Sequence, residues 1–365
     1  MYTQEGLYWV WLCSQEGIGP VKRALLLEKC GGIRQVYEAS EETYLEAGLS
    51  PQLACTLAQS KDLAFHEKNC QEWTRNGVTI LSRDDPGYPE CLKNVRPSVD
   101  LLYLIGDTSL LGTQGISIVG ARKCSPYGAG VARYFGQNLA SVGYTIISGM
   151  ASGIDACAHQ GALEVRRKTI AVLGCGIDIC YPKGNLRLYE KIAKYGLLVS
   201  EYCPGTPPKA IFFPMRNRII AALSRAVVVV EAAERSGALI TVDQALEMGV
   251  EVFSVPGSVF EETSRGTNRL IKQGAAILYD WKDLPIEIGD VIPEGSRDKE
   301  KGTKSFLDPD VQGLWEKVEW NPKNLQQLAR EMKIETERFM QCVTFLEMAG
   351  CVVRHTDGSI ARIKD

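Results

Sequence analysis

Three short segments combine glycines, hydroxyl side chains and arginines in an order that suits the binding of phosphate. They are residues 120–125 (GARKCS), 148–155 (SGMASGID) and 212–218 (FFPMRNR). Backbone N–H groups at a helix start and the forked guanidinium of arginine are the groups that hold phosphate oxygens in proteins. The sequence therefore predicts a site for phosphate, or for a chain of phosphates.

The first two segments offer one arginine and several hydrogen-bond donors. Arg122 follows an apolar run, and Ser125 and the amides of Ser148 and Gly149 lie at the expected starts of helices. We expect Arg122 to face a ligand, because ligands of open α/β sheets bind at the carboxyl ends of the strands. The alternative for Arg122 is a structural salt bridge, and for the glycines a purely steric role in tight turns.

The third segment places an aromatic residue beside two arginines. A base of an unpaired strand can stack on Phe213 while Arg216 or Arg218 meets a phosphate. The two arginines are two residues apart, so on a helix they point in different directions. One of them can bind ligand while the other pairs with an acid such as Glu231 or Glu201, and the aromatic can equally belong to the core.

The same segments disfavour NAD and nucleoside triphosphates as cofactors, although a bare phosphate site stays open. No Gly-x-Gly-x-x-Gly follows Gly120, no acid ends the second strand, and no Gly-x-x-x-x-Gly-Lys-Ser/Thr occurs in the chain. Asp155 and His159 are four apart and could form a pair on a helix, but we interpret them as a helix-capping aspartate with a packed histidine behind it. Without a catalytic constellation, the sequence indicates neither an enzyme nor a bound cofactor.

Short apolar runs rich in β-formers alternate with amphipathic stretches along the central part of the chain. The three phosphate-binding segments follow such apolar runs, so the fold of these elements determines where the segments lie. This alternation, with nearly continuous apolarity in the strands, predicts an extended Rossmann-like, doubly wound parallel sheet of the α/β class over residues 111–285. The expected strands are 116–119, 145–147, 169–173, 197–199, 226–230 and 250–255. The expected helices are 128–142, 155–165, 185–195, 217–223 and 240–248.

Other regions flank this domain. Residues 1–75 are expected to be helical, and their Gly17-Ile-Gly-Pro turn resembles that of a helix-hairpin-helix or SAM-like element, although we favour a small helical packing domain. Residues 76–110 form a bridge with two short strands, and 286–305 a charged linker rich in proline and glycine. Residues 306–365 have the order of a winged helix, in which Arg338 is the one clear basic contact of the second helix, so binding of DNA or of protein both remain open.

Bulk composition is that of an ordinary globular protein. The 365 residues carry a net charge of −3 and 45% hydrophobic side chains, so a nucleic-acid partner would need a local basic face. Twelve cysteines without a CxxC pair or a secretory signal, and three scattered histidines, predict buried thiols in the cytoplasm and no metal site. No apolar run reaches the length of a membrane span.

Long motifs in the central region resemble the DNA processing protein A (DprA/Smf) family. They are 118–122 (IVGAR), 148–155 with His159, 171–178 (AVLGCGID) with Tyr181-Pro182, 213–220 (FPMRNRII), 230–232 (VEA) with 236–241 (SGALIT), and 255–258 (VPGS). These motifs occur in order across the whole central domain. The helical start and the winged-helix end are also similar to the three-part layout of that family.

The resemblance implies binding of single-stranded DNA without base specificity, a homodimer, protection of incoming strands, and loading of RecA in natural transformation and recombination. It places the DNA site on Gly120, Ala121, Arg122, Ser125, Ser148, Gly149, Lys209, Phe213, Arg216, Asn217 and Arg218. Three positions depart from the family pattern. Ala121 replaces a frequent serine, Ser152 a frequent arginine, and Met215 is not basic, so Arg122 and Arg216 would carry more of the binding.

Two other functions compete with this interpretation. One is a nucleotide-processing enzyme of the phosphoribohydrolase-like Rossmann group, whose Pro-Gly-Gly-x-Gly-Thr turn is absent at residues 231–237. The other is an adaptor that acts through its winged-helix end. Binding to oligo-dT distinguishes the single-stranded DNA binder from both of these alternatives.

Overall fold

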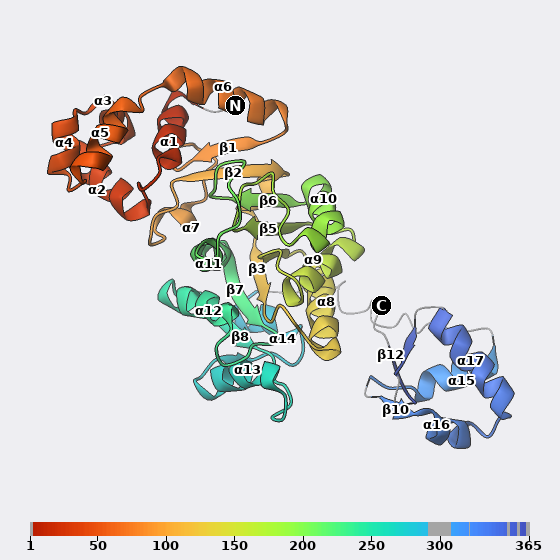
Figure 1. Cartoon of the computed structure of the whole chain (residues 1–365). Helices are drawn as coiled ribbons and strands as arrows, with labels where there is room; N and C mark the ends of the chain where they lie inside the picture. Colours follow the sequence, from red (N-terminus) through yellow and green to blue (C-terminus); the bar gives the residue numbers. More distant parts are fainter. Residues whose placement is uncertain (1–2, 291–307, 321, 349–350, 356–357, 363–365) are drawn as a thin grey trace. The chain divides into compact units, whose positions relative to one another are not determined.

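The structure is a computed structural model, and it describes residues 3–290, 308–320, 322–348, 351–355 and 358–362. The chain divides into two compact units, Met1–Ile292 and Pro293–Asp365 (Figure 1). Most of the expected linker 286–305 lies outside the described residues. No described helix is long and apolar enough to cross a membrane.

A nine-stranded, largely parallel sheet forms the centre of the first unit. Its strands lie in the order β1-β2-β6-β5-β4-β3-β7-β8-β9. The seven strands from β6 through β3 to β9 pair in parallel. The pairs β1–β2 and β2–β6 at one edge are antiparallel. The strands are β1 Thr79–Ser82, β2 Leu101–Gly106, β3 Gly115–Val119, β4 Thr145–Ser148, β5 Thr169–Leu173, β6 Leu197–Ser200, β7 Ser224–Val229, β8 Glu251–Ser254 and β9 Ala276–Ile277. The predicted α/β class with a mainly parallel sheet is therefore confirmed.

Alternating side chains of the strands pack against helices on both faces of the sheet. On β3, Ile116 and Ile118 belong to one core with Phe135 of α8, whereas Val119 belongs to the opposite core with Ile219 of α11. This period of two explains why each strand is apolar almost throughout. The helices of this layer are α8 Pro126–Ser141, α9 Ile154–Glu164, α10 Leu186–Tyr195, α11 Phe212–Ala222, α12 Gly237–Glu247, α13 Glu262–Lys272 and α14 Asp283–Glu287.

Several features of this unit differ from the expectation. Helix α11 begins at Phe212 rather than at Asn217, because Pro214 in the first turn needs no N–H partner there. Helix α13 was not predicted, since its buried positions are the small residues Ser264, Gly266 and Thr267 and give no apolar period. Strand β9, which follows α13, was also missed.

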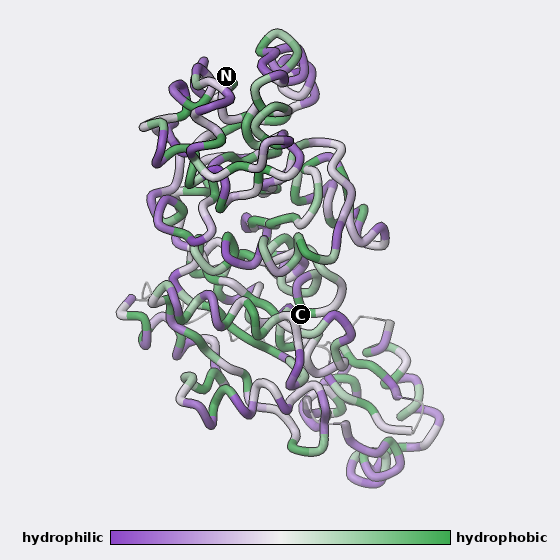
Figure 2. Tube along the Cα trace, turned by 60° about the vertical axis from the view of Figure 1, so that its left-hand side comes forward, coloured by the Kyte–Doolittle hydropathy of each residue, from purple (hydrophilic) through white to green (hydrophobic). Residues whose placement is uncertain are grey.

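Six helices precede the sheet and share a core with it. They are α1 Gln4–Ser14, α2 Pro20–Cys30, α3 Ile33–Glu38, α4 Glu41–Glu46, α5 Pro51–Gln59 and α6 Leu63–Arg75. Trp9 and Trp11 of α1 are buried in one cluster with Leu101 and Tyr103 of β2 and with Leu198 of β6. Hydrophobic segments accordingly run through the interior of this unit (Figure 2). The helix-hairpin-helix or SAM-like type stays a prediction.

The second unit has helices and a small antiparallel sheet. Its elements are α15 Pro309–Lys317, β10 Lys323–Asn324, α16 Leu325–Met332, α17 Thr336–Met348, β11 Val352–Arg354 and β12 Ser359–Arg362, with β12 between β10 and β11. A core that includes Leu314, Leu328, Phe339 and Ile360 holds them together. The expected turn at residues 356–358 lies mostly outside the described residues, and the winged-helix type stays a prediction.

Candidate nucleic-acid interface

A cleft lies beside β3, at the point where the chain stops adding strands on one side of β3 and begins adding them on the other. The chain runs from β3 to β4 on one side, and from β6 it crosses back to β7 on the other side of β3. The carboxyl ends of β3 and β7 therefore meet at the switch point that binds ligands in such sheets. The cleft there measures about 250 Å³ and is lined by Val119, Gly120, Arg122, Ala151, Asp155, Phe213, Pro214, Arg216, Asn217, Ile220, Ser236, Gly237, Ala238, Ile240 and Thr241.

Close backbone contacts make the floor of the cleft. The Ala121 N–H donates to the Glu231 carbonyl oxygen at 2.7 Å, which joins the ends of β3 and β7. A Cβ on Gly120 would lie 2.7 Å from the same oxygen, so only glycine fits. The glycine and alanine of this predicted segment thus give the floor its shape.

Arg216 is a buried cation at the side of the cleft. Only 4% of the residue is exposed, and its Nη1 donates to the Gly149 carbonyl oxygen at 2.6 Å and to that of Val172. Burial lowers the pKa of Arg216 to about 10, and the nearby Asp155 carboxylate opposes that shift. Arg216 is therefore charged at neutral pH, and among the described residues its Nε has no hydrogen-bond partner.

Asp155 holds the turn between β4 and α9. Its Oδ2 accepts from the N–H groups of Gly149 at 3.1 Å and Ala151 at 3.3 Å. Burial raises the pKa of this carboxyl group, and Arg216 counteracts that rise. The helix cap itself is Gly153, so Asp155 secures the preceding turn rather than capping α9 as we expected.

An aromatic pair and a cation lie at the mouth of the cleft. The guanidinium of Arg122 lies over the Phe213 ring at 5.3 Å, and the Tyr181 ring lies 5.4 Å from Phe213, tilted by 36°. Arg122 and Tyr181 are exposed and Phe213 is half-buried. Arg122 makes no ion pair with any residue that the structure describes, so the salt-bridge alternative is not realised.

Arg218 pairs with an acid, which is the second role that the spacing of the two arginines allowed. It is fully buried, and its Nη2 lies 2.8 Å from both carboxylate oxygens of Glu201. The expectation that one arginine of the pair binds an acid such as Glu201 is thus confirmed. Arg218 does not line the cleft, whereas half-buried Asn217 does and donates to the Gly237 carbonyl oxygen at 3.3 Å.

The predicted serines are already hydrogen-bonded within the protein. Ser125 caps α8 by accepting from the Gly128 N–H, and its hydroxyl donates to the buried carboxylate of Glu231. Ser148 is fully buried and donates to the Ile118 carbonyl oxygen at 2.6 Å. Both hydroxyls thus stabilise the sheet edge, and the Gly149 amide is likewise held by Asp155.

Lys209 lies apart from the cleft lining. It is exposed in the loop that leads to α11, and its ammonium lies 5.7 Å from the Phe212 ring centre. This position places a cation next to the start of the helix that carries Phe213. The amine can thus contact a phosphate of a strand that extends beyond the mouth of the cleft.

His159 is packed in the core behind the cleft, as expected. Its Nδ1 lies 2.7 Å from the Thr169 hydroxyl, and burial followed by the charge of Arg216 lowers its pKa to about 3. Such a histidine is neutral and has no path to a ligand. Within the described ranges, no group of three or more His, Cys, Asp or Glu side chains is placed to hold a metal ion.

Sequence reasoning missed two parts of the site. Tyr181 was noted only within a family motif, although it ends the loop after β5 at the same sheet edge as Phe213. The start of α12, from Ser236 to Thr241, forms one wall of the cleft. Both follow strands of the parallel sheet, so the rule that carboxyl ends share one edge could have found them.

The fold and the cleft define an α/β protein with a cationic, aromatic site at the switch point of a Rossmann-like sheet. The model of the family described as DNA recombination-mediator protein A matches residues 79–289. This match covers more than half of the chain, and the chain belongs to that family.

Relatives and solved structures agree with this membership. The chain is 39% identical to DNA processing protein DprA of Bacillus subtilis over 59% of this chain and 73% of that protein. It is 37% identical to protein Smf of Escherichia coli over 69% of each chain. The X-ray structure of DprA from Streptococcus pneumoniae superposes with a TM-score of 0.70, at 35% identity, over 79% of this chain and 99% of that one.

A further structure, of DNA processing protein A from Helicobacter pylori, concerns its single-stranded DNA binding mode. It matches with a TM-score of 0.53 at 30% identity, over 58% of this chain and 95% of that one. The predicted family is therefore confirmed.

Proposed function

We propose that the chain binds single-stranded DNA at this cleft and acts as a recombination mediator. The observation that carries the proposal is the exposed Arg122 stacked over Phe213, beside the buried cation Arg216. Aromatic faces and cations together suit a strand of unpaired nucleotides. The Helicobacter pylori relative and the family description support the same partner.

Two kinds of contact would hold the strand: stacking of bases on aromatic rings and attraction of phosphates to cations. One base stacks on the Phe213–Tyr181 pair, which accepts any base because every base has a π-face. Arg122 meets a backbone phosphate, and Lys209 extends the cationic path beyond the cleft. Arg216 adds positive potential from below, since its charge is buried and weakly screened.

We propose the wider role that the resemblance to the family implies. The chain acts as a homodimer in the cytoplasm, protects incoming single strands and loads RecA onto them during transformation and recombination. It does so without catalysis. The C-terminal unit is a winged helix that contacts DNA or protein, and the N-terminal helices form a SAM-like or helix-hairpin-helix domain.

Fluorescence anisotropy with labelled oligo-dT tests the proposed function. Wild-type protein should bind at submicromolar concentration, more tightly to longer oligomers and more weakly to duplex. Arg122→Ala should weaken binding about tenfold, or ~1.4 kcal/mol, and reduce the salt slope by about 0.7 as one phosphate contact is lost. The matched control is Arg167→Ala, an exposed arginine that precedes β5 at the opposite sheet edge.

Three results would contradict the proposed function or its site. If Arg122→Ala binds like wild type across the salt titration, the cleft is not the DNA site. If the wild-type protein ignores oligo-dT but releases ribose 5-phosphate from AMP, the chain is the nucleotide-processing enzyme instead. Equal losses in Arg122→Ala and Arg167→Ala would indicate a diffuse charge effect.

A further inference from the structure

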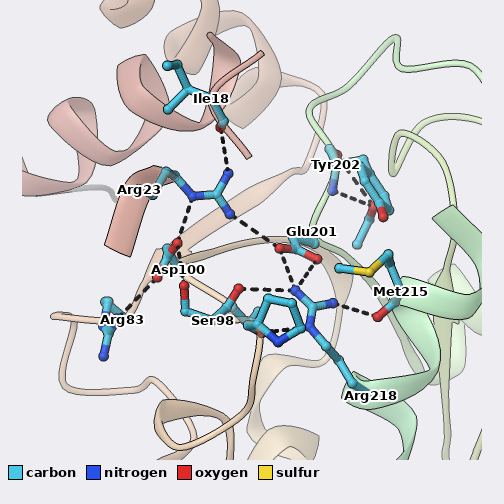
Figure 3. A network of polar contacts seen from close by, with 12 residues as sticks. Ile18, Arg23, Arg83, Ser98, Asp100, Glu201, Tyr202, Met215 and Arg218 are labelled. Carbon is cyan, nitrogen blue, oxygen red and sulfur yellow. Dashed lines mark hydrogen bonds and ion pairs between the residues drawn. The ribbon is translucent and has the colours of Figure 1, made fainter. Parts of the chain in front are cut away.

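A buried cluster of charged side chains joins the N-terminal helices to the helix that carries the cleft residues (Figure 3). Arg23 of α2 lies 2.8 Å from Asp100 through its Nε and 3.5 Å from Glu201 through its Nη2. Glu201 follows β6 and binds Arg218 of α11 through both oxygens. Arg83 contacts the second oxygen of Asp100 at 3.1 Å. We call these five residues the arginine–carboxylate cluster.

Four of the five side chains in the cluster are shielded from water, and Arg83 is partly exposed. The side chains of Asp100 and Arg218 are fully buried, and those of Arg23 and Glu201 are 7% and 10% exposed. Burying such charges costs several kcal/mol per ion unless each is paired in good geometry. Replacement by apolar side chains would often stabilise a protein at least as well. Stability alone is therefore a weak reason for this arrangement.

What the cluster does determine is the position of α11. Besides Glu201, Arg218 donates to the carbonyl oxygens of Pro97 at 2.8 Å, Ser98 at 3.1 Å and Met215 at 2.6 Å. These acceptors come from the segment before β2 and from α11 itself. A planar guanidinium with so many fixed partners leaves the helix little freedom to rotate or slide.

The same turn also holds the first residue of α11. Tyr202 follows Glu201 and stacks on Phe212, with ring centres 4.1 Å apart and planes 27° apart. Phe213 is the next residue, and Arg216 lies between Phe213 and Arg218 on the helix. The Glu201–Tyr202 turn thus fixes α11 at two points that bracket the cleft residues.

We propose that the arginine–carboxylate cluster positions α11 for single-stranded DNA, so that Arg218 and Arg23 are positioning residues that touch no DNA. The inference rests on the proposed function. It gives the N-terminal helices a role at the cleft, because Arg23 completes the coordination of the carboxylate that holds Arg218. Loss of either arginine should let Phe213 and Arg216 leave their places in the cleft.

Two measurements on the full chain test this proposal. Hydrogen exchange reports the mobility of α11 without DNA, and anisotropy with oligo-dT reports its consequence for binding. The variants are Arg218→Met, the conservative Arg218→Lys, Arg23→Met, and the pair Glu201→Met/Arg218→Met, which leaves no unpaired charge between these two positions. The control is Arg133→Met, which breaks the half-exposed Arg133–Glu164 pair between α8 and α9.

In Arg218→Met and in the paired variant, amides of residues 212–222 should exchange about tenfold faster, while those of α12 stay as in wild type. The Kd for oligo-dT should rise about tenfold with an unchanged salt slope, because no phosphate contact is lost. Arg218→Lys should recover part of both effects, and Arg133→Met should change neither. Titration at high protein concentration gives the active fraction, so a folding defect is not mistaken for weaker binding.

The proposal is overturned if the folded paired variant keeps wild-type exchange in α11 and wild-type Kd. If Arg218→Met does not fold, Arg23→Met preserves the Glu201–Arg218 pair and gives both readouts with a smaller change. Unchanged exchange and affinity in Arg23→Met would then remove the N-terminal helices from the mechanism. If wild type itself fails to bind oligo-dT, the proposed function fails, and the exchange data still decide whether the cluster holds α11.

Discussion

At the scale of single residues, two arginines on one helix show how spacing separates roles. Arg216 and Arg218 are two positions apart, so Arg216 points toward β4 and β5 while Arg218 points toward Glu201. The sequence predicted from helix geometry alone that the two side chains point in different directions. It could not predict which arginine would meet the acid, because that depends on where β6 ends relative to α11.

His159 makes stability depend on pH. Its folded pKa of about 3 lies below the ordinary value of 6.5, because burial and Arg216 disfavour the imidazolium. Protonation therefore favours the unfolded chain, and stability falls as pH drops below 6.5 until the folded pKa is reached. From pH 7 to pH 5 this histidine alone should remove about 2 kcal/mol.

Urea unfolding of wild type and His159→Gln between pH 7 and pH 5 checks this prediction. The variant should be less stable at pH 7, since the contact with Thr169 changes, but its stability should fall less on acidification. His355→Gln, at a half-buried position just after β11 in the second unit, is the control and should leave the wild-type pH profile of the first unit unchanged. Parallel profiles for wild type and His159→Gln would show that the histidine titrates normally in the folded protein.

At the scale of elements, the sequence predicted the helices and strands whose apolar residues recur with a regular period, and it missed the elements that lack such a period. The strands from β3 to β8 and the helices α8, α9, α10 and α12 match predicted segments within a few residues. Helix α13 buries only small residues, and the first turn of α11 was interpreted as a loop because it begins with two aromatics and a proline. The cleft wall formed by the start of α12 was noted only as a motif, because its place in the cleft depends on the strand order.

The cap of α8 is a second feature at this scale. Ser125 both accepts from the Gly128 N–H and donates to the buried Glu231, so its hydroxyl serves the helix start and the end of β7. Ser125→Ala should destabilise the first unit by about 2–3 kcal/mol, because a cap is lost and a buried carboxylate loses a donor. The Kd of the folded variant for oligo-dT should stay within about twofold of wild type.

Urea unfolding and anisotropy measure the two effects. Ser50→Ala provides the matched control, since Ser50 caps α5 by accepting from Leu53 at an exposed site. It should cost only about 1 kcal/mol. A strong loss of DNA affinity in Ser125→Ala at unchanged stability would instead make the hydroxyl a direct DNA contact.

At the scale of the whole molecule, the cleft belongs entirely to the first unit. Every residue that lines it lies between Val119 and Thr241, and the arginine–carboxylate cluster ties the N-terminal helices into the same unit. The net charge of −3 gave no indication of a nucleic-acid partner. Only the placement of a few cations at one sheet edge does so, and that placement follows from strand order.

The basic residue expected to contact a ligand in the second unit is paired with carboxylates. Arg338, the one clear basic residue expected on its second helix, lies 2.9 Å from Asp310 and also pairs with Asp308. These ion pairs are partly exposed and worth little to stability, yet they reduce the charge that Arg338 can offer a phosphate. We therefore expect the second unit to contribute little to the affinity for a single strand.

A chain that ends at Ile292 tests this expectation against the full chain. Its Kd for oligo-dT should lie within about twofold of the full-length value, and its salt slope should be the same, because no phosphate contact is removed. Arg338→Ala in the full chain gives an independent control that leaves both units in place. A tenfold loss on truncation together with a smaller salt slope would place a DNA contact in the second unit. A loss in Arg338→Ala as well would identify α17 as the contacting helix, whereas a loss on truncation alone would assign the contact elsewhere in residues 293–365.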